Sequence, residues 1–164
     1  MDKTELTPNT IIFGERNYET ALDIVIACAE NELLIFDQYF ECGDYASLNR
    51  FERLLAFLSK NNLSKLTIIL QNTQHFIHHC PRLFELLKLY SDKMVVFETN
   101  DIAKVAKDCF VIADKRHYLR RFHIDQARFK YAFDDVEECA NLTMRFDELL
   151  DETAEAVSAT KLGL

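Results

Sequence analysis

The sequence is poor in the residues that interrupt regular structure, since its 164 residues include only three Gly and two Pro. Their scarcity predicts dense secondary structure joined by short loops. Long apolar runs are also missing, because the longest, "IVIACA" and "LTIIL", fall far short of the roughly 18 residues that a membrane-spanning helix requires. The first residues, "MDKTELTPNT", lack the charged and then apolar pattern of a secretory signal. We therefore expect no membrane span.

The sequence also lacks several motifs of enzymes and cofactor sites. It contains no Cys-x-x-Cys pair, Gly-rich phosphate loop, Ser-x-x-Lys or Gly-x-Ser-x-Gly, and we expect no cofactor. The number of cysteines, five, is odd, which favours reduced and mostly buried thiols in a cytoplasmic protein. They are Cys28, Cys42, Cys80, Cys109 and Cys139.

Charge is unevenly distributed along the chain. The whole chain has 19 basic and 27 acidic residues, a net charge of −8, which argues against a nucleic-acid partner held by clustered Lys and Arg. Residues 115–130, "KRHYLRRFHIDQARFK", nevertheless contain six Lys or Arg and a single carboxylate. This stretch predicts a local field opposite in sign to that of the whole protein.

Helical and strand patterns alternate along what we take to be one domain, residues 11–152, between a flexible start (1–10) and a loose tail (153–164). Such alternation predicts an α/β fold with a mixed, mainly parallel central sheet flanked by helices on both faces. Strands that follow one another closely near the end predict an antiparallel hairpin. The expected strands are 32–38, 65–71, 93–98, 108–114, 118–122 and 128–133, and the expected helices are 17–31, 47–62, 75–92, 101–105 and one from 135.

The order of these elements resembles one half of a phospholipase-D-like protein over about residues 20–152. "LLIFDQYFECGDYASLNRFERLLAFLSKNNLSKLTIILQN" is similar to the strand, polar crossover, helix and second strand of that superfamily. "DCFVIAD" followed by "YLRRFHID" occupies the place of its signature strand, and "NLTMRFDELLDET" that of its closing helix. The ending "RFDELLDET" also resembles a group of uncharacterised bacterial proteins. Since enzymes of this superfamily join two similar halves, the resemblance implies a homodimer.

The superfamily signature, His-x-Lys-x-x-x-x-Asp, is incomplete in this chain. Aligned on Asp114, the lysine position holds Cys109 and the histidine position holds Lys107. A lysine ammonium is a poor nucleophile unless its pKa is strongly depressed, and a cysteine supplies no cation. The resemblance therefore implies a non-catalytic domain that binds an anionic ligand or a protein partner. Two alternatives are a phosphodiesterase that uses His117 or His123, and a purely structural or interaction protein.

The arginine-rich stretch supplies the candidate anion site. Strand alternation predicts that Arg120 and Arg121 lie on opposite faces, with His123 beside Arg121. Guanidinium groups suit phosphate or carboxylate. The competing interpretation is a solvated hairpin whose charges protect a sheet edge. The residues assigned to the anion site are Asp114, Arg120, Arg121, His123 and Arg128.

Two further groups of polar residues are candidates. The ends of two expected strands place Asp37, Tyr39, Gln71 and Asn72 around one crevice, because ligands of α/β sheets gather beyond the carboxyl ends of strands. His75 and His79 are four residues apart, a spacing that places both on one helix face and suits zinc. Since nothing in the sequence completes a ligand set, we expect no metal.

Overall fold

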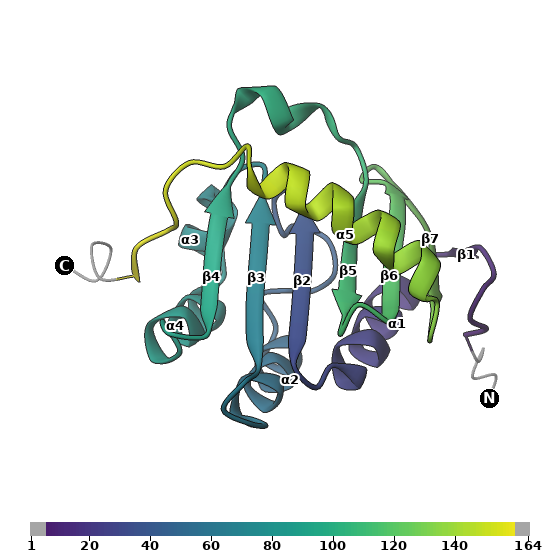
Figure 1. The fold of residues 1–164 in the computed structure, drawn as a ribbon, viewed down its shortest axis with the longest axis horizontal. Coiled ribbons are helices and arrows are strands. Elements are labelled where there is room, and N and C mark those ends of the chain that lie inside the picture. The colour runs from purple at the N-terminus through teal and green to yellow at the C-terminus, as the bar shows by residue number, and fades with distance from the viewer. Residues whose placement is uncertain (1–5, 160–164) are drawn as a thin grey trace.

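The computed structural model describes residues 6–159, which form a central sheet covered by helices on both faces (Figure 1). The strands are β1 (Ile12–Phe13), β2 (Glu32–Asp37), β3 (Lys65–Leu70), β4 (Met94–Glu98), β5 (Cys109–Ala113), β6 (His117–His123) and β7 (Gln126–Ala132). The helices are α1 (Glu15–Cys28), α2 (Leu48–Ser59), α3 (Gln74–His79), α4 (Pro81–Leu89), the 3₁₀ helix η1 (Asp101–Val105) and α5 (Val136–Leu150).

The sheet is mixed, as predicted, with seven strands in the order β1-β7-β6-β5-β2-β3-β4. Its parallel share is smaller than expected, because parallel pairing among the described residues is confined to β2 with β3 and β3 with β4. The chain returns after η1 to place β5 antiparallel to β2, and every later pairing is antiparallel. The sequence predicted the hairpin but not this return.

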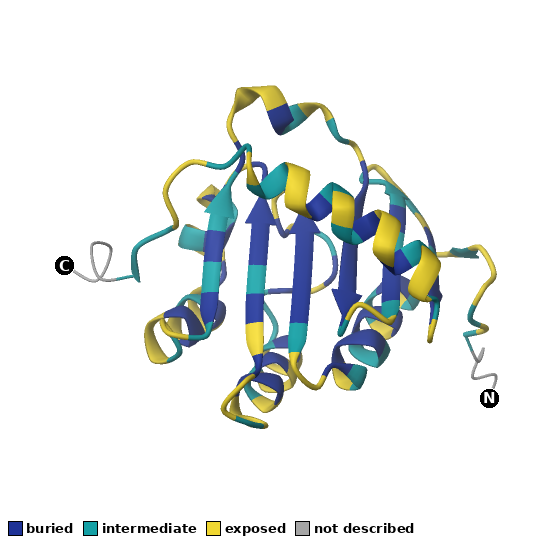
Figure 2. Ribbon diagram, viewed as in Figure 1, coloured by how far each residue is buried: buried dark blue, intermediate teal, exposed yellow. Residues whose placement is uncertain are grey.

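Each face of the sheet has its own apolar core. Helix α5 crosses one face, and α1, α2, α3 and α4 lie against the other (Figure 1). All of β5 is buried because helices cover both faces of the sheet at this strand (Figure 2). Its alternate side chains divide between the two cores, with Val111 on the side of α1 and Phe110 and Ile112 on the side of α5.

A tight turn joins β5 to β6. Asp114 and Lys115 both have positive φ, 55° and 57°, and the N–H of Arg116 donates to the carbonyl of Ala113 at 3.0 Å. Two successive left-handed residues closed by this hydrogen bond are typical of a type I′ turn, here within a loop of three residues between the paired Ala113 and His117. The predicted antiparallel hairpin is thus confirmed, with β6 and β7 as the following pair.

The ordered domain extends beyond the predicted limits of 11 and 152. Ala154 and Val157 donate backbone hydrogen bonds to Glu98 and Val96, at 3.0 and 2.8 Å, along the outer edge of β4. The Tyr131 hydroxyl donates to the carbonyl of Leu6 at 2.9 Å. The domain therefore includes part of what was predicted to be a loose tail and a flexible start. The predictions for residues 1–5 and 160–164 lie outside the described residues.

Candidate functional site

The three signature positions lie at the two ends of β5. Lys107 is exposed just before the strand, Cys109 begins it, and Asp114 follows its last residue. Five residues of extended strand separate Cys109 from Asp114 by about 16 Å. The aspartate is therefore remote from the positions that correspond to the nucleophile and the lysine.

Cys109 points into a closed cluster on the α1 side of the sheet. Its Sγ lies 3.4 Å from the hydroxyl of Tyr18 on α1, and both residues are 1% exposed. Burial raises the pKa of the Cys109 thiol well above its usual range, and the nearby Asp37 raises it further. Burial likewise raises the pKa of the Tyr18 hydroxyl. At neutral pH both groups hold their protons, so Cys109 offers no thiolate nucleophile.

The loop after β2 contributes two aromatic residues to this buried cluster. Phe40 and Tyr45 stack with ring centroids 4.0 Å apart, and both are buried. The loop turns at Gly43, where φ is +87° and an added Cβ would lie 2.7 Å from Leu22. The buried Arg50 donates to the Gly43 carbonyl at 2.8 Å. These contacts fix the position of the loop after β2, whose Phe40 and Tyr45 belong to the same buried cluster as Cys109.

Asp37, at the end of β2, is a buried member of the same cluster. Burial raises the pKa of its carboxyl to about 6, although the backbone N–H groups of residues 38–40 and the charge of Arg121 act in the opposite direction. Its Oδ1 accepts from the N–H of Phe40 at 3.1 Å. The hydroxyl of Tyr45, whose pKa the charge of Asp37 helps to raise, is buried without a hydrogen-bond partner among residues 6–159.

Arg121 lies on this buried face and is neutralised within the fold. Its Nη1 and Nη2 donate to the two carboxylate oxygens of Glu15, on α1, at 2.7 and 2.8 Å. The guanidinium packs over the ring of Tyr18 at 4.9 Å and donates to the carbonyl of Ile124 at 2.8 Å. The hydrogen bond from Arg121 lowers the pKa of Glu15. Arg121 is therefore already paired, and it cannot serve as an open anion-binding group.

Asp114 also has a structural role. Its carboxylate accepts the backbone N–H groups of Glu30 at 2.8 Å, Asn31 at 2.8 Å and Glu32 at 2.9 Å, between α1 and β2. The predicted convergence of Asp114, Arg121 and His123 is thus wrong. Asp114 is at the far end of β5, while His123 follows a register shift in β6 and its Nδ1 accepts from the N–H of Asp125 at 3.1 Å.

Arg120 and Arg128 lie on the opposite face of the hairpin, the one that carries α5. The predicted alternation is confirmed, because Arg120 pairs across the strands with Lys130 while Arg121 pairs with Phe129. The Nε of Arg120 donates to Asp108 at 3.0 Å. Arg145 of α5 also binds Asp108, at 2.9 Å through its Nη2. No pattern in the sequence indicated Asp108 and Arg145, since 37 residues separate them.

Two of the four residues predicted to surround a crevice line a pocket, and the other two do not. Tyr39 and Asn72 line a pocket of about 270 Å³ together with His75. Asp37 and Gln71 are buried instead. The Nε2 of Gln71 donates to the carbonyl of Ala106 at 2.8 Å and so holds the segment that leads into β5.

The two histidines whose spacing would suit zinc lie close to each other. The rings of His75 and His79 have centroids 5.0 Å apart. Within the described part of the chain, no three His, Cys, Asp or Glu side chains are placed to hold a metal ion.

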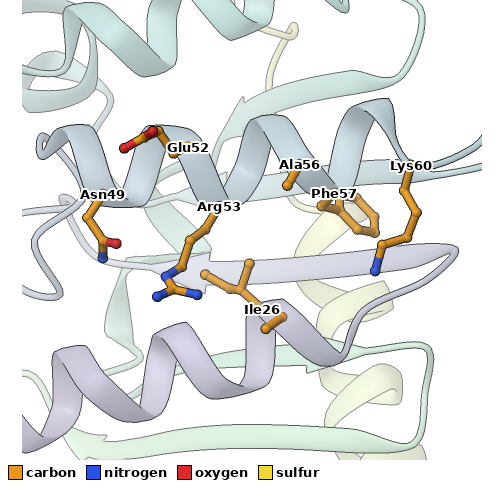
Figure 3. A pocket seen from close by; sticks show the side chains of 8 residues that line it. Ile26, Asn49, Glu52, Arg53, Ala56, Phe57 and Lys60 are labelled. Atoms are coloured by element: carbon orange, nitrogen blue, oxygen red, sulfur yellow. The ribbon is translucent and has the colours of Figure 1, made fainter.

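Another pocket, of about 410 Å³, lies between α1 and α2 (Figure 3). Phe57 and Ile26 form its apolar floor. Its two cationic groups are already paired, because Arg53 binds Asp23 at 3.2 Å and Lys60 binds Glu30 at 2.9 Å. Its lining includes none of the signature positions, so we do not assign it to the candidate site.

The fold is similar to that of phospholipase D family members. Nuc from Salmonella typhimurium, a phospholipase D family member, has a TM-score of 0.65 at 7% identity, over 91% of this chain and 99% of Nuc. Phosphatidylserine synthase of Haemophilus influenzae matches with a TM-score of 0.61 at 13% identity, over 98% of this chain and 43% of the synthase. The chain thus has the structure of a phospholipase-D-like half.

A protein that is not described as a phospholipase D family member also has a similar fold. TrmBL2, an archaeal chromatin protein with a novel mode of DNA binding, has a TM-score of 0.67 at 14% identity, and the match covers 92% of this chain and 55% of TrmBL2. This chain therefore spans about half the length of that neighbour. No curated protein matches the sequence.

The chain belongs to the family DUF7931, a domain of unknown function, whose model matches residues 15–162. Among the described residues, no helix has both the length and the apolar character needed to cross a membrane.

Proposed function

We propose that this protein is a non-catalytic phospholipase-D-like domain that acts by binding rather than by cleaving a phosphodiester. One observation carries the proposal: the lysine position of the signature holds Cys109, which is 1% exposed and faces Tyr18 instead of solvent. A phosphodiesterase needs an activated nucleophile within reach of its substrate. Here the thiol is protonated at neutral pH and belongs to the same buried cluster as Phe40 and Tyr45.

The histidines that could replace the missing nucleophile do not form a pair. His117 and His123 are the first and last residues of β6, about 20 Å apart in an extended strand. Nδ1 of His117 accepts from the N–H of Asp134, and Nδ1 of His123 accepts from that of Asp125. Among the described residues neither imidazole ring has a hydrogen bond to the buried cluster around Cys109, and His123 reaches it only through its backbone carbonyl, which accepts from Arg121 at 3.3 Å. This arrangement supports binding over an atypical catalytic site.

A phosphodiesterase assay tests the proposal. The purified protein, supplied with divalent metals, is incubated with bis(p-nitrophenyl) phosphate, and we expect no turnover above that of buffer. His123→Ala and His117→Ala are the matched controls. Turnover in the native protein that either substitution abolishes would overturn the proposal and establish the alternative catalytic site.

We also propose that the binding-competent form is a homodimer. Support comes from the comparisons, in which the chain matches one half of a longer synthase and nearly all of Nuc. Light scattering coupled to size exclusion should give about twice the 19.2 kDa mass of the chain. A monomer mass at every concentration examined would refute the dimer without affecting the proposal of a non-catalytic domain.

The described partner of TrmBL2, DNA, is not part of this proposal. A chain with a net charge of −8 repels a polyanion outside its local basic regions. A small anion or a protein partner is compatible with this charge distribution.

A further inference from the structure

The α5-bearing face of the β6–β7 hairpin carries a compact group of cations that we call the hairpin basic cluster, Arg120, Arg128 and Lys130. Arg120 and Lys130 are directly opposed across the two strands, so their side chains emerge side by side on one face. The guanidinium carbons of Arg120 and Arg128 each lie 5.3 Å from the ring centroid of Phe122. The aromatic ring therefore holds two of the three cations close together.

The charge of this cluster is not balanced within the fold. The nearest acid, Asp108, serves two arginines at once, since it accepts from Arg120 and from Arg145 of α5. Arg128 and Lys130 have no ion pair with any residue from 6 to 159. Directly opposed like charges destabilise a strand pair. The arrangement thus costs stability, and the acids near Lys130, such as Glu138 of α5, form no ion pair with it among the described residues.

Protection of a sheet edge does not explain these cations. Strand β6 lies between β5 and β7, and β7 pairs in turn with β1. Edge protection needs charges at an unpaired backbone. The cations of the cluster instead project from the face of paired strands, beside a pocket.

The pocket beside the cluster has a volume of about 220 Å³. Arg120, Lys130, Phe122 and Tyr118 line it together with Glu138, from the first turn of α5. Because Arg120 uses its Nε for Asp108, its two terminal nitrogens remain as donors without a partner among the described residues. Arg120 and Lys130 thus both contribute to the lining of one small pocket.

We propose that the hairpin basic cluster binds the phosphoryl group of a small phosphomonoester or of inorganic phosphate. A guanidinium fork binds two oxygens of a tetrahedral dianion, and an ammonium group can bind a third. Glu138 repels the dianion but accepts a hydrogen bond from a neighbouring hydroxyl, which favours a phosphorylated polyol over free phosphate. The site lies on the face of β6 opposite to Cys109, so it is separate from the signature positions.

This inference rests on the proposal that the domain binds rather than cleaves, and calorimetric titration of the full chain tests it. The probes are inorganic phosphate and glycerol 3-phosphate, with sodium chloride of equal ionic strength as the reference. We expect saturable binding of both phosphates, tighter for glycerol 3-phosphate, and no saturable response to chloride. Saturation by phosphate alone would identify the free ion as the source of the phosphoryl group.

Two variants of the cluster and one matched control locate the binding. Lys130→Met and Arg120→Met should each weaken binding by about tenfold or more, the effect of losing one charge-assisted contact. Lys65→Met removes an exposed lysine of β3 that has no ion pair among the described residues, and it should leave binding unchanged. Glu138→Gln should strengthen the binding of inorganic phosphate and reduce the preference for glycerol 3-phosphate.

Equal affinities in Lys130→Met and Lys65→Met, or a response no different from chloride, would overturn the site. Thermal melts without ligand check that each variant is folded. The assay with bis(p-nitrophenyl) phosphate gives an independent result. If the native protein cleaves bis(p-nitrophenyl) phosphate and Lys130→Met still weakens phosphate binding, the proposed function alone is refuted. If the native protein shows neither cleavage nor phosphate binding, the site alone is refuted.

Discussion

Two neighbouring arginines on opposite faces of the β6–β7 hairpin differ in how far they are buried and in how their charge is paired. Arg121 is 1% exposed and holds both carboxylate oxygens of Glu15, whereas the side chain of Arg120 is 33% exposed and shares Asp108 with another arginine. The difference originates in the covering helices, because Glu15 of α1 binds Arg121 directly, whereas Arg145 of α5 binds Asp108, the same acid that binds Arg120. A local excess of positive charge therefore identifies a binding surface only where the fold leaves the charge unbalanced.

The largest effect is expected at the buried face. Arg121→Met removes a buried guanidinium and leaves the carbonyl of Ile124 without its donor. The free energy of unfolding should fall by about 3 kcal/mol, the scale for breaking a buried ion pair and its hydrogen bonds. Urea denaturation measures it, with Arg128→Met on the same hairpin as the control, expected to change stability by less than about 0.5 kcal/mol. Similar losses in the two variants would contradict the distinction between the faces.

A smaller effect on the same face should depend on pH. Because burial raises the pKa of Asp37 to about 6, above its ordinary 3.8, the folded protein binds this proton more tightly than the unfolded chain does. The stabilisation is complete below about pH 4 and is lost as the pH rises through 6. Between pH 4 and 7 the native protein should lose about 2 kcal/mol more stability than Asp37→Asn does.

The measurement for Asp37 is urea denaturation at a series of pH values, with the two proteins compared at each pH. Taking the difference removes the contribution of carboxyls whose pKa is lowered in the folded protein, such as Asp108, which titrate at lower pH. A constant difference from pH 4 to 7 would mean that burial does not raise the pKa of Asp37.

The smallest effect is expected on the open face. Arg120→Met should change the free energy of unfolding by no more than about 0.5 kcal/mol, because relief of repulsion from Lys130 offsets the loss of a partly exposed ion pair. Added salt should reduce even this difference. Urea denaturation at low and high salt checks the result, and a loss comparable to that of Arg121→Met would show that the cluster is structural.

Local patterns predicted the local features of this molecule. The alternation of side chains placed Arg120 and Arg121 on opposite faces. The hairpin after β5 was also predicted, and so was a half of the phospholipase-D-like fold. Each of these depends on residues close in sequence or on the order of elements.

The features that the sequence left undetermined join distant segments. The pair of Glu15 and Arg121 spans 106 residues, and no local pattern indicates which acid will meet which arginine. The sharing of Asp108 between β6 and α5 depends equally on how the helix crosses the sheet. The predicted anion site grouped residues by their proximity in sequence, and the fold divided that group between two faces and two ends of the hairpin.

Asp114 shows that a turn alone can account for an acid at a motif position. Its carboxylate accepts three backbone N–H groups from the turn that leads into β2, so the fold requires an acid there whether or not any reaction occurs nearby. The other two signature positions, Lys107 and Cys109, are under no such requirement from the turn. In this chain the aspartate therefore reports on how α1 is joined to β2 and is not evidence of activity.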